Sequence, residues 1–272
     1  MKIVVTNDDG FESEGIAALV NRLSCDHDVC VVAPHRNRSG VSHHITMEKP
    51  LLIERQTIVN GSKRNGDWYS LEGFPADCVI TALRGDFLPF FPDVVVSGIN
   101  SDANLGTDVI YSGTCAAARQ ASLYGVPGIA LSLCHKVNHG EGEECHYEAL
   151  ADFAARNIVF LAGLCSDRQG MNAGVQPIDR EPLPYFVNVN ALSAERYEGM
   201  ALAGLSNREY RDSVEIEKTD DGKQYSIFHG GSIRSHGDGS DDYSIVQKGY
   251  VAISVLHTEA VCCEGINQQF VC

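Results

Sequence analysis

Residues 2–13, KIVVTNDDGFES, contain the pattern that decides how the chain is expected to fold. The run from Ile3 to Thr6 is apolar or β-branched without polar alternation, which predicts a strand buried on both faces. This strand leads directly into the polar sequence NDDG at residues 7–10. The adjacent carboxylates of Asp8 and Asp9 repel each other, so their place at the end of a buried strand indicates that a positive group binds there.

Strand and helix patterns alternate through the rest of the first half. Continuous apolar runs predict further buried strands at DVCVVAP, PDVVVSGIN and VPGIALSL, and helices are predicted at EGIAALVNRL, PADCVITAL and SGTCAAARQASLYG. Between them a hairpin is expected, with turn signals at Asn60-Gly61 and Asn65-Gly66. Buried strands separated by helices predict an α/β fold, with a mostly parallel sheet covered by helices on both faces.

The second half carries weaker signals. A helix is predicted at HYEALADFAARNIVFLAGL, then a loop from Ser166 to Pro184 and a strand at YFVNVNAL. From about residue 195 the chain is β-rich and irregular, and HGDGSDDY at residues 236–243 is expected to form a turn. We expect a single domain over residues 1–272, with a core over about 1–190 and a β-rich oligomerisation region over about 191–272.

Composition narrows the classes of function. The 272 residues are 44% hydrophobic and carry a net charge of -15, which disfavours binding to nucleic-acid duplexes or anionic membranes. A small phosphorylated substrate remains compatible, because one bound cation reverses the local potential. Without a long apolar segment or a signal-peptide pattern, the chain is expected to be cytoplasmic. The ten cysteines lack CxxC spacing, so reduced thiols are expected.

Polar clusters follow several of the predicted strands. The carboxyl ends of parallel strands meet at one edge of a sheet, where ligands bind. Oxygen atoms from Asp8, Asp9, Ser39 and Asn100 would there form a site for a hard cation, Mg²⁺ or Mn²⁺. The alternative is structural, with Asp8 or Asp9 capping the next helix and Ser39 and Asn100 in turns.

The sequence Ser112-Gly113-Thr114 precedes a helix of small residues. A helix N-terminus carries unpaired N–H groups and a partial positive charge that suit a phosphate, although Ser112 is equally a good N-cap. Arg36 and Arg38 either add positive charge near this phosphate or belong to a solvated loop. The chain has no GxxxxGK[ST] P-loop, no GxGxxG after the first strand and no DxD at its end.

Taken together, the segments VTNDDGFESEGIAAL, VVAPHRNRSGVSHHIT, GFPADCV, PDVVVSGIN and ANLGTDVIYSGTCAAARQASLYGVPGIALSL resemble the SurE survival-protein family of metal-dependent 5'/3'-nucleotidases. The resemblance implies a Rossmann-like core and an extended β-rich C-terminal part, which in this family often exchanges between subunits. A homodimer or homotetramer is therefore expected. The metal ligands implied are Asp8, Asp9, Ser39 and Asn100, and phosphate contacts are implied near Asn37, Ser39, Gly40, Ser112, Gly113 and Thr114.

The chain departs from the family pattern at Asp102, where Gly is usual, and at Phe74, where a small polar residue is usual. These departures bear on substrate range and rate. The predicted activity is metal-assisted hydrolysis of nucleoside 5'- and 3'-monophosphates with one Mg²⁺ or Mn²⁺ per subunit. In it Asp8 and Asp9 are catalytic, since they hold the metal and one of them accepts the proton of the attacking water.

Two other functions remain open from the sequence. The chain would be a non-catalytic nucleotide-binding regulatory protein if Asp102 has abolished turnover, and tight nucleotide binding without phosphate release would distinguish this case. A metal-dependent glycosyltransferase is the third candidate, and it would require activity on nucleotide sugars.

Overall fold

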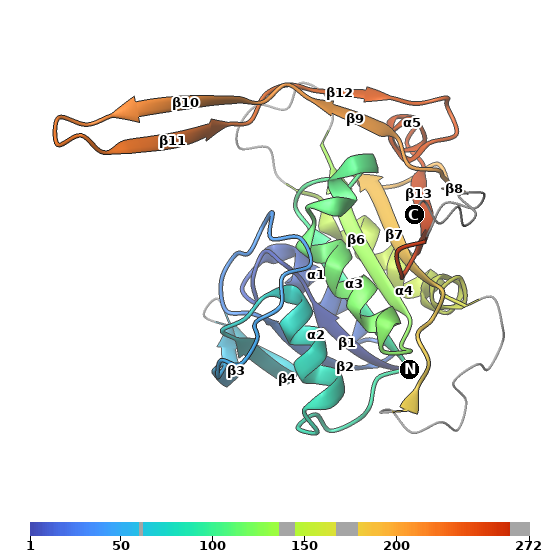
Figure 1. Ribbon diagram of the computed structural model, residues 1–272. Coiled ribbons are helices and arrows are strands. Elements are labelled where there is room, and N and C mark those ends of the chain that lie inside the picture. Colours follow the sequence, from blue (N-terminus) through green and yellow to red (C-terminus); the bar gives the residue numbers. More distant parts are fainter. Residues whose placement is uncertain (60–61, 136–144, 167–178, 262–272) are drawn as a thin grey trace, which may run out of the picture.

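The computed structural model describes residues 1–59, 62–135, 145–166 and 179–261 (Figure 1). Within these residues nine strands form one sheet in the order β3-β4-β2-β1-β5-β6-β7-β13-β8. The strands are β1 (Lys2–Thr6), β2 (Asp28–Pro34), β3 (Ile53–Val59), β4 (Ser62–Leu71), β5 (Val94–Asn100), β6 (Gly128–Cys134), β7 (Tyr185–Leu192), β8 (Met200–Leu202) and β13 (Val251–His257). The six strands from β4 to β7 in this order are parallel, whereas β3 and β13 are antiparallel to their inner neighbours.

Helices cover both faces of the sheet, as the apolar strand runs predict. On one face lie α1 (Glu14–Leu23) and α4 (Tyr147–Gly163), and on the other lie α2 (Pro75–Arg84) and α3 (Gly113–Leu123). Successive strand residues point to opposite faces, so Ile3 and Val5 join the first core and Val4 joins the second. The continuous apolar pattern of the first strand is therefore the consequence of burial on two sides.

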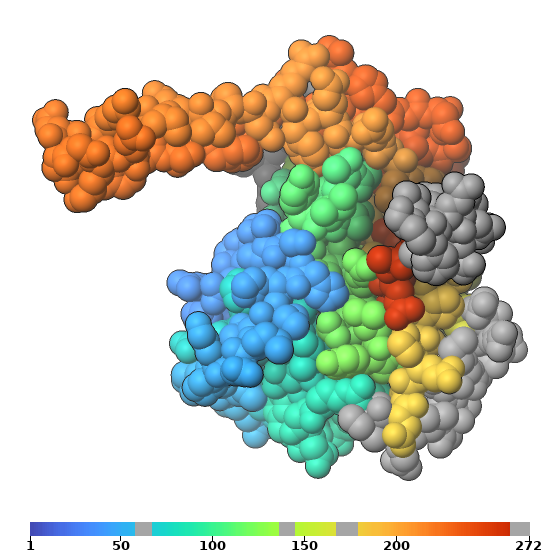
Figure 2. All heavy atoms as spheres, in the orientation of Figure 1, coloured from blue at the N-terminus to red at the C-terminus, as the bar shows by residue number. Residues whose placement is uncertain are grey.

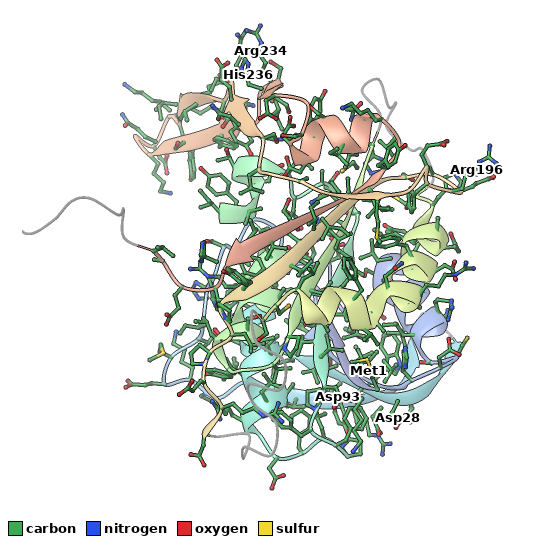
Figure 3. All side chains as sticks on the ribbon, turned by 90° about the vertical axis from the view of Figure 1, so that its right-hand side faces the viewer. Met1, Asp28, Asp93, Arg196, Arg234 and His236 are labelled. Atoms are coloured by element: carbon green, nitrogen blue, oxygen red, sulfur yellow. The ribbon has the colours of Figure 1, made fainter. Side chains whose placement is uncertain are left out.

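The strand order places a topological switch point between β1 and β5. From β1 the chain passes to β2 on one side, while β5, β6 and β7 add on the other side. The amino ends of these strands lie at the edge of the sheet where Figure 3 labels Met1, Asp28 and Asp93. The carboxyl ends, with Asp8, Asp9 and Asn100, lie at the opposite edge, where ligands bind in open parallel sheets.

The C-terminal region contains additional short elements outside the large sheet. These are β9 (Asn207–Tyr210), β10 (Ser213–Lys218), β11 (Gln224–His229), β12 (Ile233–His236) and α5 (Asp242–Gln247). The antiparallel pair β10–β11 extends well beyond the body of the molecule in Figures 1 and 2, and we call it the arm. Strands β9 and β12 pair with each other at the base of the arm, where Figure 3 labels Arg234 and His236.

Two predictions of local structure are wrong or incomplete. The Asn65-Gly66 turn is wrong because these residues lie inside β4. The expected turn at residues 236–243 holds only in its first part, because Asp241 accepts a hydrogen bond from the Ser244 N–H and caps α5. The predicted turn at Asn60-Gly61 and most of the predicted loop from Ser166 to Pro184 lie outside the described residues.

Strands β8 and β13 come from the region after residue 191 and yet belong to the large sheet.

Among the described residues, no helix combines the length and apolar character needed to cross a membrane. The seven described cysteines are all free thiols, and Cys262, Cys263 and Cys272 lie outside the described residues.

Candidate metal centre and substrate pocket

The carboxylate of Asp8 is seated against the N-terminus of α3. It accepts hydrogen bonds from the Thr114 backbone N–H (3.1 Å) and from the Thr114 hydroxyl (2.5 Å), and only 3% of Asp8 is exposed. A methyl group on Gly113 would lie 2.9 Å from the Asp8 Cβ, so this approach requires glycine. Burial raises the pKa of Asp8 above its usual value, although the hydrogen bonds from Thr114 oppose the shift.

Asp9 is bound from both sides by loops that follow other strands. Its Oδ1 accepts from Asn37 Nδ2 at 3.5 Å, and its Oδ2 accepts from the Ser101 N–H at 3.2 Å. Burial, followed by the negative charge of Asp8, raises the pKa of Asp9 to about 6, and the charge of Asp102 adds to the effect. Asp8 is thus buried and Asp9 partly buried, and the charge of the first carboxylate acts on the second.

The alternative in which Asp8 or Asp9 caps the first helix is wrong. The N-cap of α1 is Ser13, whose hydroxyl accepts from the Ile16 N–H. Asn7 supports this cap, since its Nδ2 donates to Ser13 Oγ at 2.8 Å and to the Gly10 carbonyl at 2.8 Å. Neither carboxylate is needed to begin α1, so both are left for another role.

The loop after β2 is attached to the backbone of Asp8 and to the carboxylate of Asp9. The Arg38 N–H donates to the Asp8 carbonyl at 2.6 Å, and the Ser39 N–H donates to Asn37 Oδ1 at 2.8 Å. Gly40 follows with a φ of 71°, in the left-handed region that favours glycine. These contacts fix Ser39 beside Asp8 at the end of the sheet.

The Arg38 side chain points to Phe74 and not to the pocket. Its guanidinium lies 4.7 Å from the centre of the Phe74 ring, and its Nε donates to the Gly73 carbonyl at 3.2 Å. His44 contacts the same ring at 4.0 Å between centroids. A small polar residue at position 74 would cap α2 with its side chain. Phe74 makes no such hydrogen bond, and its ring instead forms a cation–π contact with Arg38 that holds this loop.

Asn100, at the carboxyl end of β5, is 8% exposed, and its amide is oriented by the chain itself. The Nδ2 group donates to the Asp102 carbonyl at 2.7 Å, which leaves the amide oxygen as the atom available to a cation. The side chains of Asp8, Ser39 and Asn100 all line one pocket of about 260 Å³.

The pocket divides the predicted site residues into two groups. Its lining within the described residues is Asp8, Ser39, Gly40, Asn100, Ser101, Asp102, Ala103, Asn104, Asp108, Tyr111, Ser112 and Tyr210. The lining does not include Asp9, Asn37, Gly113 or Thr114. Asn37 donates to the Asp9 carboxylate, Thr114 donates to that of Asp8, and Gly113 permits the close approach of Asp8. Thr114 in particular was predicted to bind phosphate, yet its N–H and hydroxyl are both directed to Asp8.

Reasoning from the sequence missed several residues around the pocket. Asn104 is held in place by Asn188 and Asn190 of β7, whose side-chain amides donate to its carbonyl at 2.8 and 3.0 Å. Two buried asparagines in the strand FVNVN are a sequence signal that points to such a role. Asp108, Tyr111 and Tyr210 also line the pocket, and no pattern in the sequence connects Tyr210 with the other two.

The chemistry of these donors fits a hard divalent cation. The pocket lining given above contains no Lys, Arg or His, so nothing in it balances the buried carboxylates. Among the described residues there is also no group of three or more His, Cys, Asp or Glu side chains arranged to hold a metal. The candidate set is instead two carboxylates, one hydroxyl and one amide oxygen, which suits Mg²⁺ or Mn²⁺ better than zinc.

The titration of Asp9 gives a test of this arrangement in metal-free protein. The pKa of Asp9 is about 6 in the folded protein, against an ordinary value of 3.8. The protonated carboxyl therefore stabilises the fold below about pH 4, and this stabilisation is lost as the pH rises through 6. We expect Asp9→Asn to be more stable than the wild type at pH 7.5 in EDTA by on the order of 1 to 2 kcal/mol, with the gain absent at pH 4.

Urea denaturation at the two pH values measures the difference, with Asp220→Asn in the exposed turn of the arm as the matched control. Added Mg²⁺ or Mn²⁺ should stabilise the wild type and the control but not Asp9→Asn. Equal pH dependence in all three proteins would contradict the account of the paired carboxylates.

Comparison with known proteins agrees with the fold. Residues 3–212 match the family model described as survival protein SurE. A protein named 5'-nucleotidase SurE from Aeromonas hydrophila is 39% identical over 259 residues, or 94% of this chain and 92% of the relative. Another with the same name from Treponema pallidum is 42% identical over 210 residues, or 76% of this chain and 98% of the relative.

A solved structure gives the same result. The crystal structure of the SurE protein from Aquifex aeolicus superposes with a TM-score of 0.72 at 30% identity, and the match covers 96% of this chain and 95% of that one. The resemblance predicted from the motifs is confirmed, and this chain belongs to the survival protein SurE family.

Proposed function

We propose that this protein is a metal-dependent phosphomonoesterase that hydrolyses nucleoside 5'-monophosphates, and 3'-monophosphates, to nucleoside and phosphate. The observation that carries the proposal is the pair of desolvated carboxylates, Asp8 and Asp9, at the switch point of a parallel sheet beside a pocket without basic side chains. The name 5'-nucleotidase on relatives that align along almost the whole chain supports the same activity.

We infer that Asp8, Asp9, Ser39 and Asn100 hold one divalent cation per subunit, Mg²⁺ or Mn²⁺. When bound, such a cation neutralises charge on a phosphoryl oxygen and lowers the pKa of a water molecule. It also removes the repulsion that an acidic pocket would otherwise exert on a phosphate dianion. The carboxylates are held in advance by Thr114, Asn37 and Ser101, so little rearrangement is needed on binding.

The pocket residues position the phosphate group. Ser39, Gly40 and Ser112 line the pocket and are the residues we assign to phosphate contacts, while Asn37, Gly113 and Thr114 act through the carboxylates that they support. One of the two carboxylates accepts the proton of the attacking water. Preorganised donors of this kind stabilise the charge that develops in the transition state.

Removing either carboxylate tests the proposed activity. We expect Asp8→Asn and Asp9→Asn each to reduce phosphate release by at least about 100-fold, because the charge that holds the cation is halved. Phosphate release is measured on a panel of 5'- and 3'-nucleoside monophosphates with Mn²⁺, with Mg²⁺ and with EDTA, and circular dichroism checks that the fold is kept. Asp220→Asn, far from the pocket, is the control.

Substantial activity in both variants would refute the role of the carboxylates. A wild-type protein that binds nucleotides in the presence of metal without releasing phosphate would instead support a regulatory binding protein. A cytoplasmic location stays a prediction.

We further infer that the protein forms a homodimer or homotetramer through the arm. Apolar side chains are exposed along it, with Val214 60%, Ile216 55%, Tyr225 50% and Phe228 66% accessible. A two-stranded hairpin that carries such residues into solvent is poorly stabilised alone, so a second subunit is expected to cover it. Light scattering should give a mass above 29.5 kDa, and a single species at 29.5 kDa would contradict this inference.

A further inference from the structure

The pocket is lined by residues of two kinds. Asp8, Ser39 and Asn100 carry oxygen atoms that suit a cation and a phosphate. Tyr111 and Tyr210 carry aromatic rings that suit a flat apolar group. A phosphomonoester that contacts both sets would carry an aromatic group as well as its phosphate.

Tyr210 reaches the pocket from a distant part of the sequence and is held firmly there. It belongs to β9, outside the large sheet, and its hydroxyl donates to Asp108 Oδ1. The other carboxylate oxygen of Asp108 lies 3.1 Å from Arg208 Nε, in an ion pair whose side chains are only 13% and 11% exposed. This pairing offsets the negative charge of Asp108 next to Tyr210.

Tyr111 provides the second ring and lies at the mouth of the pocket. It directly precedes Ser112, its carbonyl accepts from the Ser42 N–H at 2.8 Å, and 55% of the residue is exposed. Its ring meets that of Tyr210 edge to face, with centroids 6.3 Å apart and planes at 89°. This exposure leaves Tyr111 accessible to another planar group.

We propose that Tyr210 and Tyr111 form the binding site for the nucleobase, which makes β9 of the C-terminal region a determinant of substrate specificity. The inference rests on the proposed nucleotidase function and adds to it the group that is recognised and the residues that recognise it. Stacking tolerates any base because each has a planar face. The site therefore separates nucleotides from phosphate esters without a base, while it discriminates weakly between bases.

Steady-state kinetics with two substrates tests the proposal. Adenosine 5'-monophosphate carries the base and ribose 5-phosphate lacks it, while the phosphate and the sugar are shared. In Tyr210→Ala we expect KM for the nucleotide to rise by about 10-fold, the value of one lost stacking contact, with KM for ribose 5-phosphate nearly unchanged. Tyr210→Phe keeps the ring and should recover most of the loss, because Arg208 still pairs with Asp108.

The matched control is Tyr250→Ala, which removes an exposed tyrosine that does not line the pocket. It should change neither KM, and light scattering on each variant separates effects on assembly. Equal losses on both substrates in Tyr210→Ala would overturn the proposal and indicate a purely structural role, as would an unchanged KM for the nucleotide.

A second measurement distinguishes failure of this proposal from failure of the nucleotidase function. Calorimetry with adenosine, which has a base and no phosphate, does not depend on turnover. Adenosine should bind the wild type and Tyr210→Phe, and its affinity for Tyr210→Ala should be about 10-fold lower. Binding that is equal in the wild type and Tyr210→Ala would overturn the base site even if the wild type hydrolyses nucleotides.

Discussion

The contact between the Asp8 carboxylate and the N-terminus of α3 is the constraint on which the rest of the site depends. A buried carboxylate next to a second one is unfavourable unless other groups stabilise it. The helix N-terminus supplies the Thr114 N–H and hydroxyl, and Gly113 permits the close approach. These contacts hold Asp8 without neutralising it, so that the pair keeps a negative charge for a cation to bind.

The topology of the sheet brings the remaining groups to this point. The switch between β1 and β5 brings Asp9 next to Ser101, and the loop after β2 adds Asn37 and Ser39. Residues much later in the chain then complete the pocket. Asn188 of β7 donates to the Asn104 carbonyl, and β9 contributes Tyr210 to the lining. In the proposed function, chemistry at the metal and recognition of the base thus come from different parts of the fold.

Much of this arrangement follows from local sequence. Buried parallel strands have a continuous apolar pattern, and the polar residues that follow them indicate the carboxyl edge of the sheet. The sequence therefore predicts that Asp8, Ser39 and Asn100 lie together, and all three line one pocket. Contacts that depend on distant segments left no such pattern. Asp242 is one example, because its buried carboxylate accepts from the Gly106 and Ser206 N–H groups while its sequence neighbourhood is typical of a turn.

The same limit applies to Thr114. A serine, a glycine and a threonine before a helix indicate an anion at its N-terminus, and that expectation was sound. The anion that the structure places there is the Asp8 side chain, contributed by a strand about a hundred residues earlier. Which of two anions occupies a helix N-terminus is decided by tertiary packing, and here the close contact at Gly113 decides it.

Anomalous diffraction from crystals grown with Mn²⁺ tests the central claim most directly. The account predicts one manganese peak per subunit, bound by oxygen atoms of Asp8 and Asp9 with Ser39 and Asn100 next to it. A fully occupied peak elsewhere, or no peak beside these carboxylates at a Mn²⁺ concentration that supports activity, would contradict it.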